Sequence, residues 1–301
     1  MSQKNQKILF VTGKGGVGKS TVAAAIALRA SGQGKKVLLV ELAEQSYFRH
    51  LLNVEVQYQP TPWRENLWVS CWEGDASLRE YLKFYVRIEA IVDLFFNNVV
   101  MKTFIQAAPA LREISILGKA TSGIRNVGPS FDFDLIVIDS YATGHFKALL
   151  RAPKGLAEAV KLGPMGDQSR QIDELLRNPK YCSYAIVTLP EELPVSECGE
   201  LYHDLSEDLG ISPKIFCNKV WDIPLSPAEL SALGEKFLGR DPGGIELTNY
   251  LQVVEERQDQ SLKNLAAIDG GYKTLPLSFG ETGESLVERL AERIDWNGLD
   301  V

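Results

Sequence analysis

The chain has 301 residues, of which 45% are hydrophobic and 24% are charged, proportions that exclude a disordered or fibrous protein. Its 32 Lys and Arg residues against 39 Asp and Glu residues give a net charge of −7, which disfavours binding to nucleic acid or to anionic lipid. No run of about 18 apolar residues occurs, and only Ile8–Val11 is apolar near the N-terminus, so we expect neither a membrane span nor a secretory signal.

Short β-rich runs alternate with helix-length segments along almost the whole chain. Strands that are apolar throughout and separated by helices favour an α/β fold, with a doubly wound, mostly parallel sheet flanked by helices. We expect strands at Ile8–Thr12, Val37–Glu41, Leu67–Cys71, Leu135–Asp139, Ala185–Leu189 and Lys214–Asn218. We expect helices at Lys19–Ser31, Ser77–Gln106, Pro153–Leu162, Asp167–Leu176, Pro194–Leu209, Pro227–Leu238 and Thr248–Leu265, and a loop at Arg240–Gly244.

A glycine-rich segment between the first strand and the first helix carries the strongest chemical signal. It matches the phosphate-loop pattern G-x-x-x-x-G-K-[ST]. Glycines let backbone N–H groups turn toward phosphate oxygens, and the helix N-terminus adds partial positive charge. We expect Lys19 to reach the β- and γ-phosphates of a nucleotide and Ser20 to bind Mg²⁺. The candidate nucleotide-binding residues here are Gly13, Lys14, Gly15, Gly16, Val17, Gly18, Lys19, Ser20 and Thr21.

Lys14 makes this loop more particular, because a lysine directly after the first glycine lies at the mouth of the loop. The segment GKGGVGKST resembles the deviant phosphate loop (deviant Walker A motif) of a group of dimeric P-loop ATPases. That group contains the nitrogenase iron protein, the MinD and ParA positioning ATPases, and the arsenite-pump/Get targeting ATPases. The resemblance implies that the protein binds ATP as a homodimer and that Lys14 reaches the partner's nucleotide. The alternative is a solvated loop lysine.

The strand that ends at Asp139 leads into a second segment that resembles a motif of these ATPases. Asp139 is placed to hold Mg²⁺ through a water at the carboxyl end of a strand beside the phosphate loop. Ser140–His145 (SYATGH) resembles the D-[TS]-A-P-T-G-H switch segment of the arsenite-pump/Get family, with Tyr141 and Ala142 replacing Ala and Pro. The resemblance implies that Gly144 senses the γ-phosphate.

Three further site residues come from the same resemblance. The family has Asp-Pro-Ala where this chain has Glu41-Leu-Ala, which implies that Glu41 orients or activates the attacking water with a longer side chain. Asn218 matches an asparagine that contacts adenine, and its alternative is a turn-forming residue at a strand end. Thr274–Leu277 resembles a loop that packs against the base, so Pro276 joins the expected ATP-binding residues.

The motifs run from Gly13 to Pro276, so we expect one P-loop ATPase domain over residues 1–301, with a helical subdomain at residues 76–125. The apolar segment Ile91–Ile105 is either a core helix or a surface for a partner or client. The four cysteines, Cys71, Cys182, Cys198 and Cys217, form no C-x-x-C pair and favour reduced, cytoplasmic thiols.

Four functions of this group compete: a ParA-like partitioning ATPase, a MinD-like membrane ATPase, an arsenite-pump subunit and a Get-type targeting factor. The absence of a Lys/Arg-rich stretch argues against a ParA-like ATPase on DNA, and the acidic balance of Glu281–Asn297 argues against a MinD-like membrane helix. We therefore expect a cytoplasmic, Mg-ATP-dependent ATPase of the arsenite-pump/Get type that couples ATP binding and hydrolysis to an unknown partner or client protein. A MinD/ParA-like positioning ATPase and a slow or non-hydrolysing, nucleotide-gated scaffold stay open as alternatives.

Overall fold

A computed structural model describes residues 6–86, 96–98, 110–128, 131–238 and 241–295. Within these residues, eight strands form one sheet in the order β3-β4-β2-β5-β1-β6-β7-β8, parallel except for the antiparallel pair β3 and β4. The strands are β1 (Lys7–Gly13), β2 (Val37–Leu42), β3 (Thr61–Arg64), β4 (Leu67–Trp72), β5 (Leu135–Ala142), β6 (Cys182–Thr188), β7 (Lys214–Val220) and β8 (Lys273–Pro276).

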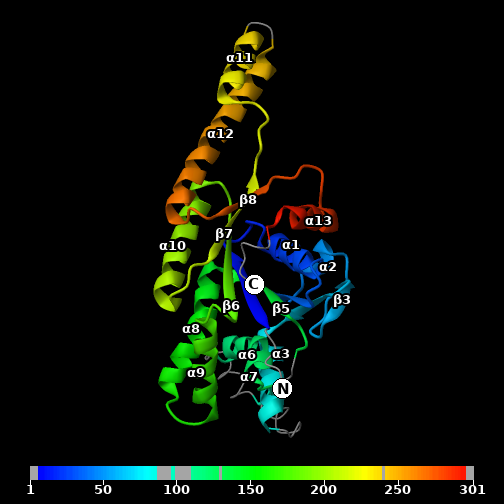
Figure 1. Cartoon of the computed structure of the whole chain (residues 1–301), viewed down its shortest axis with the longest axis vertical. Helices are drawn as coiled ribbons and strands as arrows, with labels where there is room; N and C mark the ends of the chain where they lie inside the picture. The colour runs from blue at the N-terminus through cyan, green and yellow to red at the C-terminus, as the bar shows by residue number, and fades with distance from the viewer. Residues whose placement is uncertain (1–5, 87–95, 99–109, 129–130, 239–240, 296–301) are drawn as a thin grey trace.

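Helices cover both faces of this sheet (Figure 1). One face is covered by α1 (Lys19–Ser31), α2 (Phe48–Leu51) and α13 (Gly283–Arg293). The other is covered by α6 (Ala110–Ala120), α8 (Thr143–Ala159), α9 (Pro164–Leu176) and α10 (Glu192–Leu209). The remaining described helices are α3 (Gly74–Val86), α7 (Ser122–Arg125), α11 (Pro227–Phe237) and α12 (Pro242–Ile268).

The alternation of side chains along β1 explains the two layers. Leu9 and Val11 pack in the cluster that contains α1 and α13, whereas Ile8 and Phe10 pack in the cluster that contains α8 and α10. Successive residues of a strand point to opposite faces, so a strand that is apolar throughout needs helices on both sides. The doubly wound α/β fold expected from the sequence is confirmed.

The position of β1 decides where a ligand can bind. β1 pairs with β5 on one side and with β6 on the other, so the chain crosses to opposite sides of β1 in its two halves. A crevice forms at such a switch point, outside the carboxyl ends of the strands. The glycine-rich loop leaves β1 at this edge.

All six expected strands are present, and the described residues contain two further strands that were not expected. β3 is a short edge strand with alternating burial, and β8 has only four residues, of which Leu275 is buried. Short strands at the edges of a sheet carry little apolar periodicity, which is why the sequence pattern does not reveal them.

Two expectations about helices are wrong. α8 begins at Thr143, within the switch segment, and not at Pro153, which lies buried inside the helix. Pro242 to Gly244 form the first turn of α12, not a loop. Pro242 is tolerated because a proline at the first helical position has no N–H to leave unsatisfied. Gly244 is tolerated because it packs closely on Phe237, where an added Cβ would come within 2.7 Å of the ring. Tertiary packing therefore overrides the usual reading of Pro and Gly as breakers.

Groups of helices extend the molecule beyond the sheet at both of its ends (Figure 1). The hairpin of α11 and α12 projects from one end, while α3, α6 and α7 gather with α8 and α9 at the other. The described part of the expected subdomain at residues 76–125 lies at this second end, and its treatment as a subdomain of a single domain stays a proposal. Apart from residues 96–98, the apolar segment Ile91–Ile105 lies outside the described residues. Among the described helices, none has both the length and the apolar character that a membrane crossing requires.

Candidate nucleotide site

The phosphate loop curls between β1 and α1. Gly16 and Gly18 have positive φ angles of 85° and 93°, which L side chains rarely adopt. At Gly13 an added Cβ would lie 2.1 Å from the carbonyl oxygen of Val187, so only glycine fits against β6. The loop backbone is therefore held in the curled form that a phosphate cradle needs.

The two lysines of the loop point in different directions. Lys19 Nζ donates to the carbonyl oxygen of Lys14 at 3.0 Å, so its ammonium lies within the loop. Burial lowers the pKa of Lys19, and the charge of Asp139 opposes that change. Lys14 Nζ instead pairs with Glu197 Oε1 on α10 at 2.7 Å, outside the loop. The Lys19 ammonium thus lies within the loop of its own chain, whereas the Lys14 ammonium points away from that loop.

Two carboxylates lie side by side at the ends of neighbouring strands. Glu41 on β2 is in register with Asp139 on β5, and each is 5% exposed. Burial raises the pKa of Asp139 to about 7, the charge of Glu41 also raises it, and a hydrogen bond from Ser20 and the charge of Lys19 lower it. Asp139 Oδ1 is buried and has no hydrogen-bond partner among the described residues.

This arrangement fits a divalent cation. A carboxylate and a hydroxyl are the hard oxygen ligands that Mg²⁺ prefers, and Asp139 and Ser20 supply them beside the phosphate loop. A cation here would offset the cost of burying the Asp139 charge. Ser20 and Asp139 are therefore the residues here whose oxygens could hold Mg²⁺, and their role as its ligands stays a prediction.

Glu41 has a contact set that the sequence did not reveal. Its Oε2 accepts from Ser46 Oγ at 2.6 Å and from the Phe48 N–H at 3.3 Å, while Oε1 accepts from the Tyr47 N–H at 2.9 Å. The carboxylate thereby holds the loop that leads into α2. Tyr47 also lines the nucleotide cavity described below, so Glu41 connects this loop to the site.

The switch segment leads directly into α8. Ala142 is the N-cap residue, and Thr143 and Gly144 form the first helical turn. N–H groups in a first turn have no helical partner, so they are able to donate to an anion. The start of the segment is tied to the phosphate-loop strand, because Thr12 Oγ1 donates to the carbonyl oxygen of Tyr141 at 3.0 Å.

A cavity of about 390 Å³ opens beside the phosphate loop. It brings together several of the expected site residues: Gly16, Gly18, Lys19, Ser20, Thr21, Asn218 and Pro276. Asn218 Nδ2 donates to the carbonyl oxygen of Val17 at 2.9 Å, which fixes β7 against the loop. Val17 itself has its side chain in the core, and Gly15 is exposed on the outer side of the loop.

Sequence reasoning missed part of this cavity wall. Lys219, with a positive φ of 58°, lines it together with Ser278 and with Leu286 and Leu290 of α13. Glu197, the partner of Lys14, was also missed. These residues lie far from the motifs in the sequence and carry no motif of their own, so only the tertiary fold reveals them.

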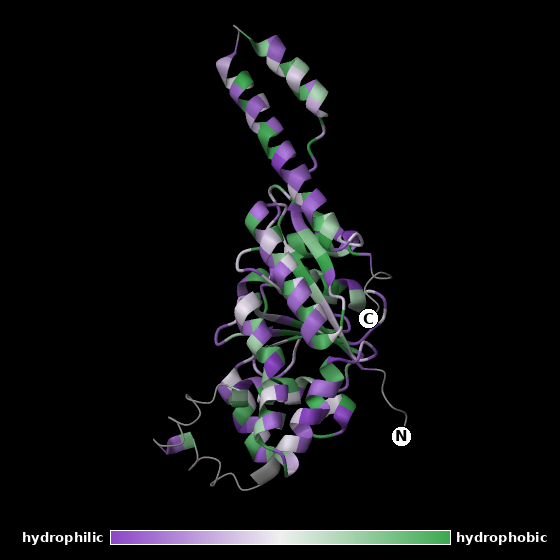
Figure 2. Cartoon of the chain, turned by 90° about the vertical axis from the view of Figure 1, so that its left-hand side faces the viewer, coloured by the Kyte–Doolittle hydropathy of each residue, from purple (hydrophilic) through white to green (hydrophobic). Residues whose placement is uncertain are grey.

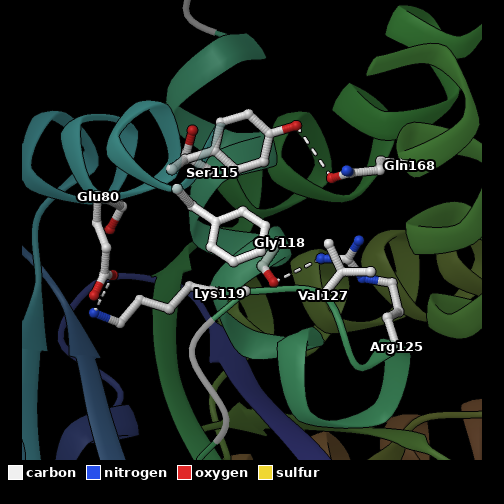
Figure 3. A pocket seen from close by; sticks show the side chains of 11 residues that line it. Glu80, Ser115, Gly118, Lys119, Arg125, Val127 and Gln168 are labelled. Atoms are coloured by element: carbon white, nitrogen blue, oxygen red, sulfur yellow. Dashed lines mark hydrogen bonds and ion pairs between the residues drawn. The ribbon is translucent and has the colours of Figure 1, made fainter. Parts of the chain in front are cut away.

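A second cavity lies in the helical end of the molecule (Figure 3). Its volume of about 20 Å³ holds no more than a single water. Lys119 Nζ pairs with Glu80 Oε2 at 2.7 Å and lies 3.5 Å from the centre of the Tyr58 ring. Tyr81 Oη donates to Gln168 Oε1 at 3.2 Å. We interpret this cluster as internal support for the helices and not as a ligand site.

The cysteines are free, and three of the four, Cys182, Cys198 and Cys217, belong to the core. Burial raises the pKa of the Cys198 thiol to about 12, and that of Cys217 to about 12. Among the described residues, no group of three or more His, Cys, Asp or Glu side chains is arranged to hold a metal ion. These thiols therefore act as small apolar groups in the core.

A parallel sheet with a glycine-rich loop at its switch point, a lysine in that loop and a carboxylate on the neighbouring strand defines a P-loop nucleotide hydrolase. The sequence profile of the anion-transporting ATPases matches residues 6–163, just over half of the chain. The chain belongs to this family, and it is an ATP-hydrolysing enzyme.

Curated relatives agree with this assignment. "ATPase BagA" of Mycobacterium tuberculosis is 30% identical over 250 residues, which cover 78% of this chain and 71% of the relative. "Putative arsenical pump-driving ATPase 2" of Aquifex aeolicus is 27% identical over 289 residues, covering 83% of this chain and 91% of the relative. "ATPase ASNA1 homolog" of Plasmodium berghei is 25% identical over 233 residues, which cover 66% of this chain and 59% of the relative.

Proposed function

We propose that the chain acts as a Mg-ATP-dependent, nucleotide-switched homodimer that couples ATP binding and hydrolysis to the binding of a partner or client protein in the cytoplasm. The observation that carries the proposal is the direction of Lys14, whose ammonium lies outside the phosphate loop on Glu197. A lysine in this position is poorly placed for its own nucleotide but accessible to a second subunit related by a two-fold axis.

Within one subunit, Lys19 neutralises the β- and γ-phosphates, and the N–H groups between Gly13 and Ser20 cradle the phosphate oxygens. Ser20 and Asp139 would hold Mg²⁺, which would supply charge neutralisation on the phosphates when bound. Asn218 and Pro276 form the side of the site where the base packs. Support for these roles comes from the shared cavity and from the buried, unpartnered oxygen of Asp139.

Hydrolysis needs a group that positions water beside the γ-phosphate. Glu41 is the candidate because it lies beside Asp139, and its longer side chain already holds the Ser46–Phe48 loop. Movement of that loop on nucleotide binding would free a carboxylate oxygen for water. Gly144, in the first turn of α8, would donate its N–H to the γ-phosphate and pass its presence or loss to the helix.

The chemistry of the client stays open within this proposal. A MinD/ParA-like positioning ATPase is less favoured, because the net charge of −7 disfavours binding to DNA or to anionic lipid. Free core thiols do not favour arsenite as a ligand either, because a soft metalloid needs accessible, clustered thiolates.

Mass measurement in solution tests the switch. Light scattering in the presence of ADP and in the presence of a non-hydrolysable ATP analogue, both with Mg²⁺, should give a monomer or weak dimer with ADP and a stable dimer with the analogue. A nucleotide-gated scaffold would give the same masses without phosphate release. Equal masses with both nucleotides would contradict the proposed switch.

A further inference from the structure

The hairpin of α11 and α12 has no role in the ATPase chemistry described above, although it is the part of the molecule that projects farthest from the sheet (Figure 1). α12 has 27 residues, a length of about 40 Å. α11 packs along it, with Phe237 against Gly244 and a hydrogen bond of 2.8 Å from Gln252 Nε2 to Ser231 Oγ. The outer face of α12 is left uncovered by α11.

That outer face is apolar. Leu247 and Tyr250 are each 57% exposed, and Val253 is 43% exposed. Their spacing of three residues places them along one side of the helix. Figure 2 shows hydrophobic segments alternating with hydrophilic ones along the projecting hairpin. A row of large apolar side chains on a projecting helix is the usual form of a docking site for another helix.

The charge of the hairpin restricts the kind of partner. Residues 221–262 contain eight acidic and three basic side chains, a balance of −5 within a chain whose total is −7. Glu246 and Glu256, both exposed on α12, flank the apolar row. A second copy of this chain would bring the same negative charge to the interface, whereas a basic segment would be attracted.

The base of α12 is linked to the nucleotide site by a specific side chain. Gln258 Nε2 donates to the Trp221 carbonyl oxygen at 2.9 Å, and the Trp221 N–H donates to Gln258 Oε1 at 2.8 Å. Trp221 directly follows β7, three residues after Asn218, which bonds to the phosphate loop. The amide of Gln258 therefore holds the strand end that forms one wall of the nucleotide cavity.

The surroundings of this link are open. A cavity of about 610 Å³ separates the base of α12 from the sheet, and it is lined by Trp221, Gln258, Pro276 and others. Pro276 also lines the nucleotide cavity. The two Gln258 hydrogen bonds join α12 to Trp221 beside this cavity, whereas Leu265, about two turns farther along α12, is buried in the core. Gln258 lies roughly 8–17 Å along the helix from the three residues of the apolar row.

We propose that the Leu247–Tyr250–Val253 face of α12 is the docking surface for a basic amphipathic helix of another protein, and that Gln258 transmits its binding to the nucleotide site. The docking surface stands on the hairpin alone. The transmission rests on the proposed function as an ATP-switched protein.

A short synthetic helical peptide of leucine and lysine, labelled with fluorescein, tests the docking surface by fluorescence anisotropy at physiological ionic strength. The wild-type chain should bind it, and the double substitution Leu247→Ser and Tyr250→Ser should weaken binding about tenfold or more. A matched control, Leu162→Ser, removes an 88% exposed leucine at the other end of the molecule and should leave binding unchanged. The same peptide with glutamate in place of lysine should bind at least about tenfold more weakly.

Three results would overturn the docking surface. The first is equal binding of the peptide by the wild type and the double variant, and the second is equal binding of the lysine and glutamate peptides. The third is conversion of a wild-type dimer into a monomer by the double substitution, which would make this face an interface between two copies of the chain. Circular dichroism of each variant confirms that the hairpin is folded.

The transmission is tested with Gln258→Ala. In the wild type, the lysine peptide should change the rate of ATP turnover about threefold or more, whereas Gln258→Ala should bind the peptide equally and lose this response. An unchanged response in Gln258→Ala would overturn the link. If the chain failed to dimerise on ATP, the proposed function would fall, while peptide binding would still report on the docking surface.

Discussion

Asp139 and Glu41 occupy neighbouring positions at the ends of β5 and β2, yet their charges are stabilised in different ways. Glu41 accepts three hydrogen bonds from the Ser46–Phe48 loop, so its charge is well solvated by the protein. Asp139 has one buried oxygen without a partner among the described residues, and its pKa rises to about 7. Of the two, Asp139 therefore gains more from a bound cation, while Glu41 holds the Ser46–Phe48 loop.

Replacement of Asp139 by Asn should stabilise the nucleotide-free protein at pH 8 and abolish Mg-dependent hydrolysis. The pKa of Asp139 is raised from 3.8 to about 7, so the folded state binds the proton more tightly than the unfolded state. The cost of the charged form is absent below pH 4, grows as the pH rises toward 7, and is fully present above it. The gain in unfolding free energy is at most about 4 kcal/mol.

Urea unfolding of the two proteins at pH 5 and pH 8 measures this effect, because the difference between variant and wild type isolates Asp139 from other titrating groups. The gain should be larger at pH 8. A gain that is the same at both pH values, or a loss at pH 8, would show that Asp139 is not a buried, uncompensated carboxylate.

Glu41→Gln should leave ATP affinity within a factor of about three and slow hydrolysis about 10²-fold or more, because an amide cannot take a proton from water. The amide oxygen can still accept from Ser46 Oγ and the Phe48 N–H, but the amide NH2 group cannot accept from the Tyr47 N–H. Nucleotide binding measured with a fluorescent ATP and phosphate release measured in a single turnover separate the two effects. A normal hydrolysis rate would leave Glu41 as an anchor of the Ser46–Phe48 loop only.

At the scale of single elements, the central strands could be predicted because each is a continuous apolar run. α1 could be predicted because glycines mark both of its ends. α1 has the residues that we expected, Lys19–Ser31, since a glycine precedes it and another follows it. α8 was predicted to begin ten residues late because Pro153 suggested a helix start, whereas Phe146 and Leu149 bury the preceding turns and keep them helical. The tendency of proline to begin or break a helix is overridden where burial of apolar side chains supplies more free energy.

The candidate site divides in the same way. Gly13 to Thr21 could be predicted because a phosphate loop requires these residue types at fixed spacing. Asp139 could be predicted because it directly follows the apolar run of a strand, which is visible in the local sequence. Glu197, Lys219 and the leucines of α13 could not, because only the order of the strands brings them to the loop. Long-range neighbours leave no trace in a local pattern.

Gly244→Ala should loosen the α11–α12 hairpin. A Cβ at Gly244 would meet the Phe237 ring at 2.7 Å, and such crowding costs about 1–3 kcal/mol. Gly243→Ala is the matched control, since its Cβ would approach Asp241 at an ordinary 3.5 Å and alanine favours the helix. Hydrogen exchange of the α11 and α12 amides should accelerate in the first variant only. Equal protection in both would mean that α11 does not pack on Gly244.

At the scale of the whole molecule, the pair Lys14–Glu197 joins the phosphate loop to α10 within one chain. The proposed dimer requires Lys14 to leave this partner for the nucleotide of the second subunit. Both side chains are about one-third exposed, at 32% and 31%, so the pair contributes about 0.2–1 kcal/mol and can be broken by a γ-phosphate. The Glu197 contact therefore opposes dimer formation weakly.

Glu197→Gln should strengthen the dimer formed with a non-hydrolysable ATP analogue by about 2- to 30-fold in Kd, because Lys14 is released from its intramolecular partner in each of the two subunits. Sedimentation equilibrium measures this Kd. Glu200→Gln removes the same charge from the exposed side of α10 and should change the Kd little. A weaker dimer in Glu197→Gln, or equal effects of the two substitutions, would mean that Glu197 does not restrain Lys14.

The central claim is that Lys14 acts on the nucleotide of the other subunit, and mixing two inactive variants tests it most directly. Lys14→Ala keeps its phosphate loop but lacks the bridging lysine, whereas Lys19→Ala keeps Lys14 but loses the ammonium for its own phosphates. Each variant alone should hydrolyse ATP poorly. An equimolar mixture should recover roughly a quarter of the wild-type rate, since half of randomly paired dimers are mixed and each mixed dimer has one complete site. A mixture no more active than its two components would contradict the account.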